Sequence, residues 1–303
     1  RPPRSTLDRS SAAADVYKRQ VLRLDNGKFL SVKIDGNPKH CYLNPRDGAI
    51  GCFEEACRNV VCTGATPIGM VDHLQFGNPE DPEIFWTFME SLEGLTDFAK
   101  FLKIPCVGGK VSFYNETPSG PIKPTPLIGV LGIINKTPLQ PTPPKSGDYL
   151  VIVGNTKNEL GGSEYFEYID DFIGGICPTV DFKISKSNMA TVLSLIKQDL
   201  VESVHDCAKG GLSIAVSEMS IFGKIGCNID IGKLPSEKNL NFEQLLFSES
   251  HSRYLLVVSK KNIKKVRQVL LKKKNLFGVL GSFSSDQICI CLLYTSPSPR
   301  DRG

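Results

Sequence analysis

Residues 104–116 hold the side chains of this sequence that are best suited to bind an anion. A short apolar run there reaches a glycine pair that ends at Gly109, and Lys110 and Ser112 follow it. Glycines let the backbone approach a ligand closely, the lysine can offset negative charge, and the serine hydroxyl can donate to an oxygen. The segment is not a P-loop, because the glycine required five residues before Gly109 is missing. Phosphate binding and an ordinary strand-to-loop turn fit these residues equally well.

Asp72 is a second candidate, because it is a carboxylate inside the apolar run of residues 69–74. Burying an ionised carboxylate is costly unless a cation, a metal ion or strong hydrogen-bond donors accompany it. A nucleotide with its Mg²⁺ would supply such a partner. The residues alone favour a simpler interpretation, in which a carboxylate at a strand end accepts hydrogen bonds from loop amides. They assign a structural role to the neighbouring His73.

Two further glycine pairs stand beside polar side chains, and the second of them opens a predicted helix. The N-terminus of a helix carries partial positive charge and exposed amides, which suits a phosphate. Such turns also join elements without any ligand, and that interpretation is slightly favoured. The residues concerned are Gly161, Gly162, Ser163, Asp206, Lys209, Gly210 and Gly211.

The charge of the chain argues against a nucleic-acid partner. Its 303 residues include 36 Lys and Arg against 32 Asp and Glu, a formal net charge of +4. Residues 1–20 hold five basic and two acidic residues, and residues 292–303 hold two and one, so the remaining 271 residues are net neutral. A nucleic-acid-binding protein concentrates basic charge on its folded part. Both flanks resemble translated adaptor or vector sequence, so we expect non-native ends and a fragment of a longer protein.

No segment predicts a membrane span or a zinc site. The longest apolar run, residues 126–134, is about half of the roughly 20 residues that a membrane helix needs, and no export signal opens the chain. The ten cysteines include no Cys-x-x-Cys pair, and the four histidines lack zinc-motif spacing. We expect a soluble cytoplasmic protein with buried, reduced thiols and no contact with membrane or nucleic acid.

Periodicity and turn residues predict a mixed α/β layer in the first half of the chain. Asp81, Pro82 and Glu83 form a strong helix start, since aspartate caps free amides, proline tolerates the first turn and glutamate suits the helix dipole. A turn is expected at Gly108-Gly109. The predicted helices run from about 48 to 64 and from 81 to about 102, and the predicted strands cover residues 28–35, 67–74, 104–107 and 127–134.

Residues 135–147 carry four prolines in a short polar stretch and are the best candidate linker. Beyond it, helices and strands alternate again. The predicted strands cover residues 149–153, 253–258 and 278–283, and the predicted helices cover residues 187–200, with Ser187 as the cap, 211–222 and 262–273.

Eight short motifs, each weak alone, occur together in an order that resembles one family. They are DGNP (35–38), YLNP with Gly48 (42–48), EEACRN (54–59), VDHLQFGNPE (71–80), VGGKVSFYNE (107–116), LGGSE (160–164), HDCAKGGL (205–212) and FSESHSR (247–253). From residue 28 to about 291, the chain is similar to the second half of the phosphoribosylformylglycinamidine synthases. These enzymes catalyse the fourth step of purine biosynthesis.

The resemblance implies two domains of the aminoimidazole-ribonucleotide-synthetase type, also called PurM-like. Residues 21–140 would form an N-terminal α/β domain with a mixed sheet, and residues 141–291 a C-terminal α+β domain, between non-native flanks at 1–20 and 292–303. The family's synthetase is a tandem duplication, and this chain resembles its second copy only. The N-terminal domains of the two copies pack their sheets into one barrel, so a missing N-terminal half is implied as a partner.

The resemblance also implies an ATP-dependent carbon–nitrogen ligase. ATP activates the formyl-amide oxygen of formylglycinamide ribonucleotide as a phosphate ester, and ammonia from a glutaminase subunit or domain displaces it. The implied cofactors are ATP and Mg²⁺. The family's catalytic histidine belongs to the first copy, so no catalytic residue is expected here, and neither His73 nor His205 takes that role.

Motif by motif, the resemblance places Asp72 and Gly109 at ATP contacts and Ser112 at a substrate contact. Lys110 stands where many relatives have an asparagine that binds Mg²⁺. An ammonium group cannot ligate a cation, so that metal contact is in doubt and Lys110 could instead replace part of the metal's charge at the phosphates. Larger family members also hold a nucleotide that they do not turn over, and residues 160–164 and 205–212 would line that second site.

Two other interpretations stay open at this point. The chain could be a catalytically idle nucleotide-binding module that stabilises an assembly. It could also be another ATP-using member of the superfamily, such as an aminoimidazole ribonucleotide synthetase, a selenophosphate synthetase or a hydrogenase-maturation relative. The combination of residues 72–80 with residues 108–116 disfavours the last group.

Overall fold

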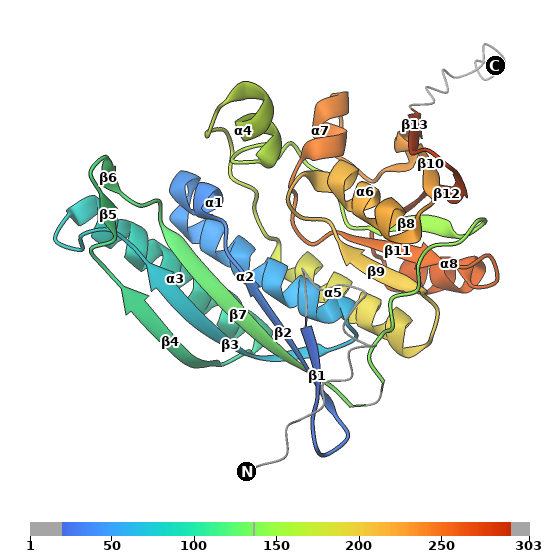
Figure 1. Cartoon of the computed structure of the whole chain (residues 1–303), viewed down its shortest axis with the longest axis horizontal. Coiled ribbons are helices and arrows are strands. Elements are labelled where there is room, and N and C mark those ends of the chain that lie inside the picture. Colours follow the sequence, from blue (N-terminus) through green and yellow to red (C-terminus); the bar gives the residue numbers. More distant parts are fainter. Residues whose placement is uncertain (1–19, 136, 292–303) are drawn as a thin grey trace.

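The computed structural model describes residues 20–135 and 137–291, which form two sheets with their own helices (Figure 1). The first half contains β1 (Gln20–Arg23), β2 (Phe29–Asp35), α1 (Pro38–Leu43), α2 (Pro45–Cys62), β3 (Thr66–Gln75), α3 (Pro82–Leu102), β4 (Cys106–Ser112), β5 (Glu116–Thr117), β6 (Gly120–Pro121) and β7 (Thr125–Ile134). The sheet order is β1-β2-β7-β3-β4, antiparallel except for the parallel pair β3 and β4. The predicted mixed sheet of the first half is confirmed.

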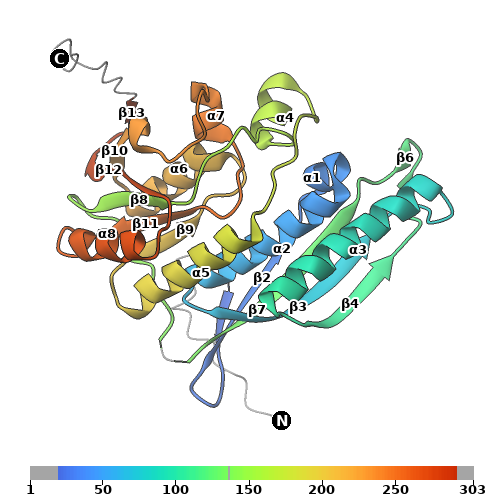
Figure 2. The ribbon, with the colours of Figure 1, turned by 180° about the vertical axis from the view of Figure 1, so that it is seen from behind.

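Helix α3 begins where the sequence predicts, and it carries the chain from β3 to the parallel strand β4. The Asp81 side chain accepts a hydrogen bond from the amide of Glu83 (2.8 Å), and Pro82 lies in the first turn. The helix ends at Leu102, and the next residue, Lys103, caps it with a left-handed φ of 61°. Figure 2 shows α2 and α3 side by side on one face of the sheet. The candidate site lies between this face of the sheet and α3.

The predicted turn at Gly108-Gly109 is wrong, because both glycines lie inside β4. They pair with Val71 and Asp72 of β3, and the strand continues to Ser112. β4 is an edge strand whose residues are almost all exposed, and an exposed edge tolerates residues that pack no side chain. Because side chains alternate along a strand, Gly109 and Ser112 belong to opposite faces.

The second half forms a six-stranded mixed sheet of order β13-β10-β12-β8-β11-β9. Its elements are β8 (Tyr149–Val153), α4 (Glu164–Asp170), α5 (Phe182–Lys197), β9 (Ser203–Asp206), α6 (Gly211–Gly223), β10 (Gly226–Asp230), a 3₁₀ turn (Ile231–Lys233), α7 (Phe242–Phe247), β11 (Tyr254–Val258), α8 (Ile263–Lys272), β12 (Phe277–Ser285) and β13 (Cys289–Cys291). Alternate residues of β8 serve two cores: Val151 and Val153 pack with the core of α2 and α5, and Leu150 and Ile152 with that of α6. Both faces of this sheet are therefore covered.

The predicted start of α5 at Ser187 is wrong. The cap is Asp181, whose side chain accepts a hydrogen bond from the amide of Ile184 (2.9 Å). Aspartate is among the preferred capping residues, and it adds a full turn that the apolar pattern does not reveal. The sequence analysis also misses β1, α1, α4, α7, β9, β10 and β13, which have three to seven residues each and are too short to show a period.

Helix α2 packs on the first sheet and on α5 of the second half, so it joins the two halves (Figure 2). Glu54 and Arg58 of α2 are almost completely buried and form an ion pair. The hydroxyl of Ser185 in α5 donates to Glu54 (3.1 Å). A buried charge is tolerated only with partners of this kind, so the position of α5 against α2 is fixed by polar contacts as well as by packing.

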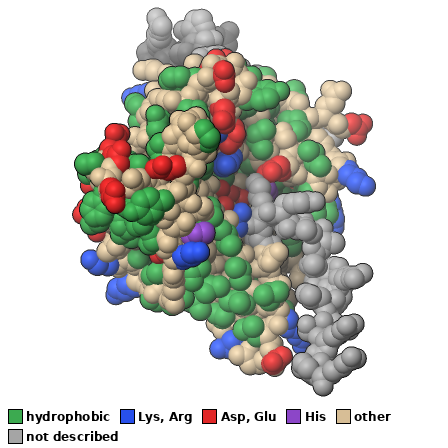
Figure 3. All heavy atoms as spheres, turned by 60° about the vertical axis from the view of Figure 1, so that its left-hand side comes forward, with side chains coloured by type: hydrophobic (Ala, Val, Ile, Leu, Met, Phe, Trp, Pro, Cys, Tyr) green, Lys and Arg blue, Asp and Glu red, His purple; other side chains and the backbone are tan. Residues whose placement is uncertain are grey.

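The other face of the first sheet carries no helix among the described residues. Ile34, Val71 and Gly129 share this face, because a Cβ on Gly129 would lie 2.7 Å from Val71 and 3.7 Å from Ile34. Ile34 is 61% exposed, and Val107 at the sheet edge is 60% exposed. Figure 3 shows hydrophobic side chains gathered in a broad patch on this side of the molecule. We call this surface the open face.

The structure agrees with one of the remaining sequence predictions, contradicts part of another and does not cover a third. Residues 135 and 137–147 hold no helix or strand, as expected of a linker. All ten cysteines are free; seven are buried, but Cys106, Cys289 and Cys291 are exposed, so the expected burial is wrong for these three. The predicted non-native flanks fall on residues 1–19 and 292–303, outside the described residues, although Gln20 belongs to β1. In the described ranges, no helix is long and apolar enough to cross a membrane.

Candidate nucleotide site

Asp72 lies within β3, directly opposite Gly109 of β4. A Cβ on Gly109 would be 2.2 Å from Oδ1 of Asp72, so only glycine leaves room for the carboxylate beside β4. The interpretation of Asp72 as a strand-end carboxylate bonded to loop amides is wrong. Its hydrogen-bond partner among the described residues is the thiol of Cys106, whose Sγ lies 3.5 Å from Oδ2.

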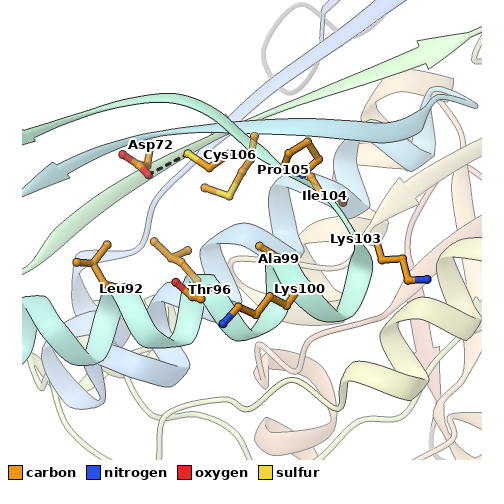
Figure 4. Close-up of a pocket in the computed structure, with 11 residues that line it drawn as sticks. Asp72, Leu92, Thr96, Ala99, Lys100, Lys103, Ile104, Pro105 and Cys106 are labelled. Carbon is orange, nitrogen blue, oxygen red and sulfur yellow. Dashed lines mark hydrogen bonds between the residues drawn. The ribbon is translucent and has the colours of Figure 1, made fainter.

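Asp72 and Cys106 line a pocket of about 590 Å³ between the sheet and α3 (Figure 4). Figure 4 shows the two strand residues on one side of the pocket and the side chains of α3 on the other, with Lys103 at one end. This volume falls in the range of small-molecule sites, and the carboxylate is the acceptor in an otherwise mainly apolar lining. The apolar lining residues are Met70, Leu92, Leu95, Ala99, Ile104 and Pro105.

The thiol of Cys106 acts as a donor in this pocket. Burial raises the pKa of the Cys106 thiol above its usual value, so the proton stays on sulfur at neutral pH. The thiol lies 3.5 Å from Oδ2 of Asp72 and 3.3 Å from the carbonyl oxygen of Gly108, so its one proton can be donated to either acceptor, and Oδ1 of Asp72 accepts no hydrogen bond from the described residues. Sequence reasoning missed Cys106, and its place beside Asp72 becomes visible only from the strand register.

Ser112 lies at the end of β4, three residues beyond Gly109 and about 10 Å along the strand. Asn115 holds it: Nδ2 of Asn115 donates to Oγ of Ser112 (3.2 Å) and to its carbonyl (2.9 Å). The same amide donates to the carbonyl of Phe76 at 3.0 Å. Ser112 pairs with Gln75, on the open face rather than in the pocket. The structure thus brings Asp72 and Gly109 together and sets Ser112 apart from them.

Lys110 pairs with His73 on the open face and is exposed. Its ammonium group has no lone pair with which to bind a cation. In the part of the chain that the structure describes, no group of three or more His, Cys, Asp or Glu side chains is arranged to hold a metal ion. The residues around Asp72 therefore do not form a metal site by themselves.

The second cluster of predicted residues gathers around one buried carboxylate. Oε1 of Glu249 accepts hydrogen bonds from the amide of Gly210 (2.8 Å) and from the amide of Glu164 (2.9 Å). The Oγ of Ser163 caps α4 by accepting from the amide of Phe166 (3.2 Å). The two glycine turns, far apart in sequence, thus meet at Glu249. Glu249 belongs to the motif at residues 247–253, but no local pattern predicts that it accepts hydrogen bonds from both turns.

Positive φ values explain the glycines of this cluster. Gly210 and Gly211 have φ of 71° and 64°, and a Cβ on Gly211 would lie 2.7 Å from two carbonyl oxygens. Gly162 has φ of 65° and faces the ring of His40, whose Cδ2 would lie 2.9 Å from a Cβ there. Other residues would clash at these points, so the backbone can bring its amides to Glu249 only with glycine.

Asp206 does not belong to this cluster, because it faces α2. Its carboxylate accepts a hydrogen bond from Nδ2 of Asn59 (3.1 Å). Burial, followed by repulsion from Glu55, raises the pKa of Asp35 to about 8, and Asp206 adds to the shift. Asp35, Glu55 and Asp206 thus form an acidic group between the two halves, with Lys33 3.1 Å from Asp35. Asp35 and Glu55 each belong to one of the motifs in the sequence, but no feature of the sequence predicts that their carboxyl groups lie close together.

Comparison with known proteins relates the chain to one family. The N-terminal domain of AIR synthase related protein matches residues 17–134, and the C-terminal domain of the same family matches residues 145–288. The phosphoribosylformylglycinamidine synthase subunit PurL of Thermococcus sibiricus is 40% identical over 269 residues, 88% of this chain and 37% of the relative. That of Methanococcus aeolicus is 41% identical over 278 residues, 90% and 37% of the two chains. The chain spans little more than a third of these relatives.

Solved structures show the same fold. Thermotoga maritima PurL complexed with FGAR matches with a TM-score of 0.77 at 21% identity, over 88% of this chain and 44% of that chain. The same protein complexed with ATP gives a TM-score of 0.72. A chain of the HypE–HypF complex gives 0.70 at 14% identity, over 95% and 94% of the two chains. The predicted PurM-like fold, with an α/β and an α+β domain, is confirmed.

Proposed function

The chain belongs to the AIR synthase related protein family, and from this we propose that it is the C-terminal part of a phosphoribosylformylglycinamidine synthase. That enzyme converts formylglycinamide ribonucleotide to the amidine with ATP and glutamine-derived ammonia. The observation that carries the proposal is the pocket in which Asp72 offers a free carboxylate oxygen beside Gly109. The proposed reaction also places the chain in the cytoplasm.

The pocket suits the adenine ring of ATP. Oδ1 of Asp72 can accept a hydrogen bond from the exocyclic amino group of adenine, while guanine would present a carbonyl oxygen that the carboxylate repels. The apolar side chains of α3 and β3, with Leu92 and Met70 among them, supply the surfaces between which a flat ring can lie. The proposed selectivity for ATP over GTP follows from this single acceptor.

The glycine pair of β4 offers a path from the pocket to the open face. Gly108 and Gly109 leave a stretch of the sheet edge without side chains, so a triphosphate can cross the edge there. Beyond the edge it would meet Lys110, which offsets phosphate charge, and the hydroxyl of Ser112, which is positioned by Asn115. The substrate contact proposed for Ser112 therefore lies on the side where the transferred phosphoryl group would arrive.

The chemistry needs positioning and charge neutralisation more than covalent participation by the protein. The formyl-amide oxygen attacks the terminal phosphorus of ATP, and ADP leaves. Ammonia then attacks the activated carbon, and phosphate leaves with the former amide oxygen. In this scheme Asp72 anchors the nucleotide and Lys110 stabilises the charge that develops at the phosphates.

Mg²⁺ enters the proposal as a counter-ion of the nucleotide phosphates. The described residues near Asp72 do not fit a metal centre, since Lys110 cannot ligate a cation and no group of three acidic or other ligating side chains is arranged around one. We therefore assign its protein ligands to the N-terminal portion that the relatives carry. No step of the reaction is assigned to the metal through residues of this chain.

The open face is the proposed contact for that missing N-terminal half. Its exposed apolar side chains, among them Ile34 and Val107, form a surface that isolated soluble domains rarely present. Covering it with a second sheet would bring another set of residues to the edge at Lys110 and Ser112. A glutaminase subunit or domain is the further proposed partner, because the second step of the reaction consumes ammonia.

The cluster around Glu249 is proposed as the second nucleotide site. It comprises Gly161, Gly162, Ser163, Lys209, Gly210 and Gly211, and Asp206, which faces α2, is left out of it. Its glycine turns and lysine support phosphate binding in general.

The test is a calorimetric titration of Mg·ATP, Mg·ADP and Mg·GTP into the chain alone and into the chain mixed with the N-terminal portion of a PurL relative. We expect ATP to bind the mixture better than GTP, with amidine formed when substrate and ammonia are added. Asp97→Asn, a change on α3 at an exposed residue paired with Arg46, is the matched control that should bind ATP normally.

Each outcome separates the interpretations. ATP binding by the chain alone, with no amidine formed by the mixture, would favour the idle nucleotide-binding module. If ATP binds only in the mixture, the contacts at Asp72 bind ATP only when the N-terminal half is packed beside them. No ATP binding in either sample, or equal binding of GTP, would contradict the proposal.

A further inference from the structure

Glu249 occupies the position that an anion would take in the second cluster. One oxygen of its carboxylate accepts from two amides, that of Gly210 at the start of α6 and that of Glu164 across the cluster. The residue is 4% exposed, and this burial raises the pKa of Glu249 to about 7, while the amides of Gly210 and Glu164 favour its charged form. Amides that converge on one oxygen at the start of a helix are the common way in which proteins hold phosphate or sulfate.

His40 supplies an independent sign that this position is built for a larger anion. Its ring is 3% exposed, and Nδ1 lies 3.1 Å from Nδ2 of Asn37, which can only donate. Nδ1 is therefore the acceptor, and Nε2 carries the proton. Nε2 lies 3.6 Å from Oε2 of Glu249, too far for a hydrogen bond. The backbone of Gly161 is a further polar neighbour of the ring, but Nε2 forms no well-shaped hydrogen bond in the described ranges. A buried donor is left aimed at the carboxylate without reaching it.

Two lysines complete the surroundings. Nζ of Lys39, which is almost buried, lies 3.0 Å from Glu164 and also pairs with Glu167. Nζ of Lys209, which is half exposed, lies 3.6 Å from the same oxygen of Glu164. Both ammonium groups therefore lie close to Glu164, whose amide donates to Glu249, and they could supply counter-charge to a phosphate bound there.

We propose that Glu249 is an internal anion that fills a phosphate-binding position, and that a phosphate group binds at the second cluster only after the Glu249 side chain leaves it. The proposal rests on the second nucleotide site proposed above and refines it. A tetrahedral phosphate presents more oxygens than a carboxylate and can accept from both amides and from Nε2 of His40 together. In the chain as it stands, the carboxylate holds α4 and the start of α6 together, and the position is closed.

The experiment follows the amide resonances of Gly210 and Glu164 in the full chain while inorganic phosphate is added. In the wild type, both resonances should stay unchanged. Glu249→Ala removes the acceptor, so both should move upfield and the melting temperature should fall. Added phosphate should return both resonances downfield and restore the melting temperature, with an affinity at least about tenfold above that of the wild type. Glu243→Ala, at an exposed residue of α7, is the matched control and should behave as wild type.

Three results would overturn the proposal. The first is a phosphate-dependent shift of these two amides in the wild type, and the second is a folded Glu249→Ala variant that phosphate does not rescue. If Glu249→Ala does not fold under the conditions of the titration, its refolding yield in phosphate buffer is compared with its refolding yield in chloride buffer. Equal yields in the two buffers are the third result that would overturn the proposal. Glu249→Gln keeps an acceptor in place, so it should fold and ignore phosphate. ATP binding at Asp72 is followed separately, through the amide resonance of Thr96 in the pocket. A failure of the main proposal at Asp72 is therefore distinguished from a failure of this one.

Discussion

The two glycine-rich clusters of this chain look alike in sequence and differ in structure. Each joins a glycine pair to a lysine and a nearby carboxylate. Around Gly109 the carboxylate of Asp72 lines a pocket of about 590 Å³ and keeps one oxygen without a donor from the described residues. Around Gly210 the carboxylate of Glu249 is buried and accepts from two amides. The carboxylate of the first cluster can still accept a hydrogen bond from a ligand. The carboxylate of the second cluster already accepts hydrogen bonds from the protein's own amides.

The difference comes from backbone conformation and burial, not from residue type. Gly108 and Gly109 continue an exposed edge strand that is hydrogen-bonded to β3 on one side only. Gly210 and Gly211 have left-handed φ, and the amide of Gly210 donates to the buried Glu249 at the start of a helix. A sequence with glycines beside a lysine therefore predicts a close backbone approach, but not whether a ligand or the protein itself makes that approach.

The largest expected effect separates the two clusters by stability. In Gly161→Ala, the new Cβ would lie 2.0 Å from the carbonyl oxygen of Ile176, which is backbone and must shift as a whole. We expect a loss of about 3 kcal/mol or more in the free energy of unfolding. In Gly109→Ala, the Cβ meets the Asp72 side chain, which can rotate away, so stability should change little while ATP binding is lost. Denaturant unfolding and calorimetry measure the two effects.

The control for this pair is Gly69→Ala in β3, where the nearest atom to a Cβ is Cγ1 of Val107 at an ordinary 3.6 Å. It should leave both stability and ATP binding unchanged. If Gly109→Ala unfolds the chain as strongly as Gly161→Ala, the distinction between an open and a self-satisfied cluster fails.

A pH dependence of stability should arise from the buried carboxyls and not from the open pocket. Burial and repulsion from Glu55 raise the pKa of Asp35 to about 8, from 3.8 in the unfolded chain. Between these values the folded state binds more protons, so stability falls as pH rises from about 4 to 8. Asp35→Asn should flatten this slope by a few kcal/mol at most across the window. Thermal unfolding at several pH values measures it, and an unchanged slope would contradict the raised pKa.

Asp72→Ala tests the open cluster by affinity. Loss of a hydrogen bond to a charged acceptor costs about 2 kcal/mol, or roughly 30-fold in the dissociation constant of ATP. Asp72→Asn keeps an acceptor and should lose only part of this. Neither variant should lower the melting temperature much, because the hydrogen bond that Asp72 accepts among the described residues comes from a thiol, which is a weak donor. Equal affinities for wild type and Asp72→Ala, measured by calorimetry in the mixture with the N-terminal portion, would remove Asp72 from the site.

The sequence predicts the long elements well and their meeting points poorly. Helix α3 is announced by Asp81 and Pro82 and by an apolar stripe long enough to show its period. Cys106 beside Asp72, and Glu249 between two amides, depend on strand register and on contacts across 34 to 85 residues. No local pattern encodes such distances. The family motifs mark which residues matter, but the partner of each becomes visible only in the fold.

Lys110→Asn is expected to have the smallest effect and to act on the open cluster alone. Lys110 lies on the open face beside the path proposed for the triphosphate, where the resemblance places an asparagine that binds Mg²⁺. The lysine supplies a fixed positive charge, while an asparagine supplies a neutral oxygen that a cation can use. With the N-terminal portion present, the variant should bind metal-free ADP more weakly and Mg·ADP as well or better, a change of a few-fold in their ratio, worth less than about 1 kcal/mol. Titrations with and without Mg²⁺ give this ratio.

If the ratio stays the same, Lys110 does not face the phosphates and the path across the edge at Gly108 and Gly109 is wrong. If it changes while the amides of Gly210 and Glu164 stay fixed, phosphate charge is handled at one of the two clusters only, as their structures require.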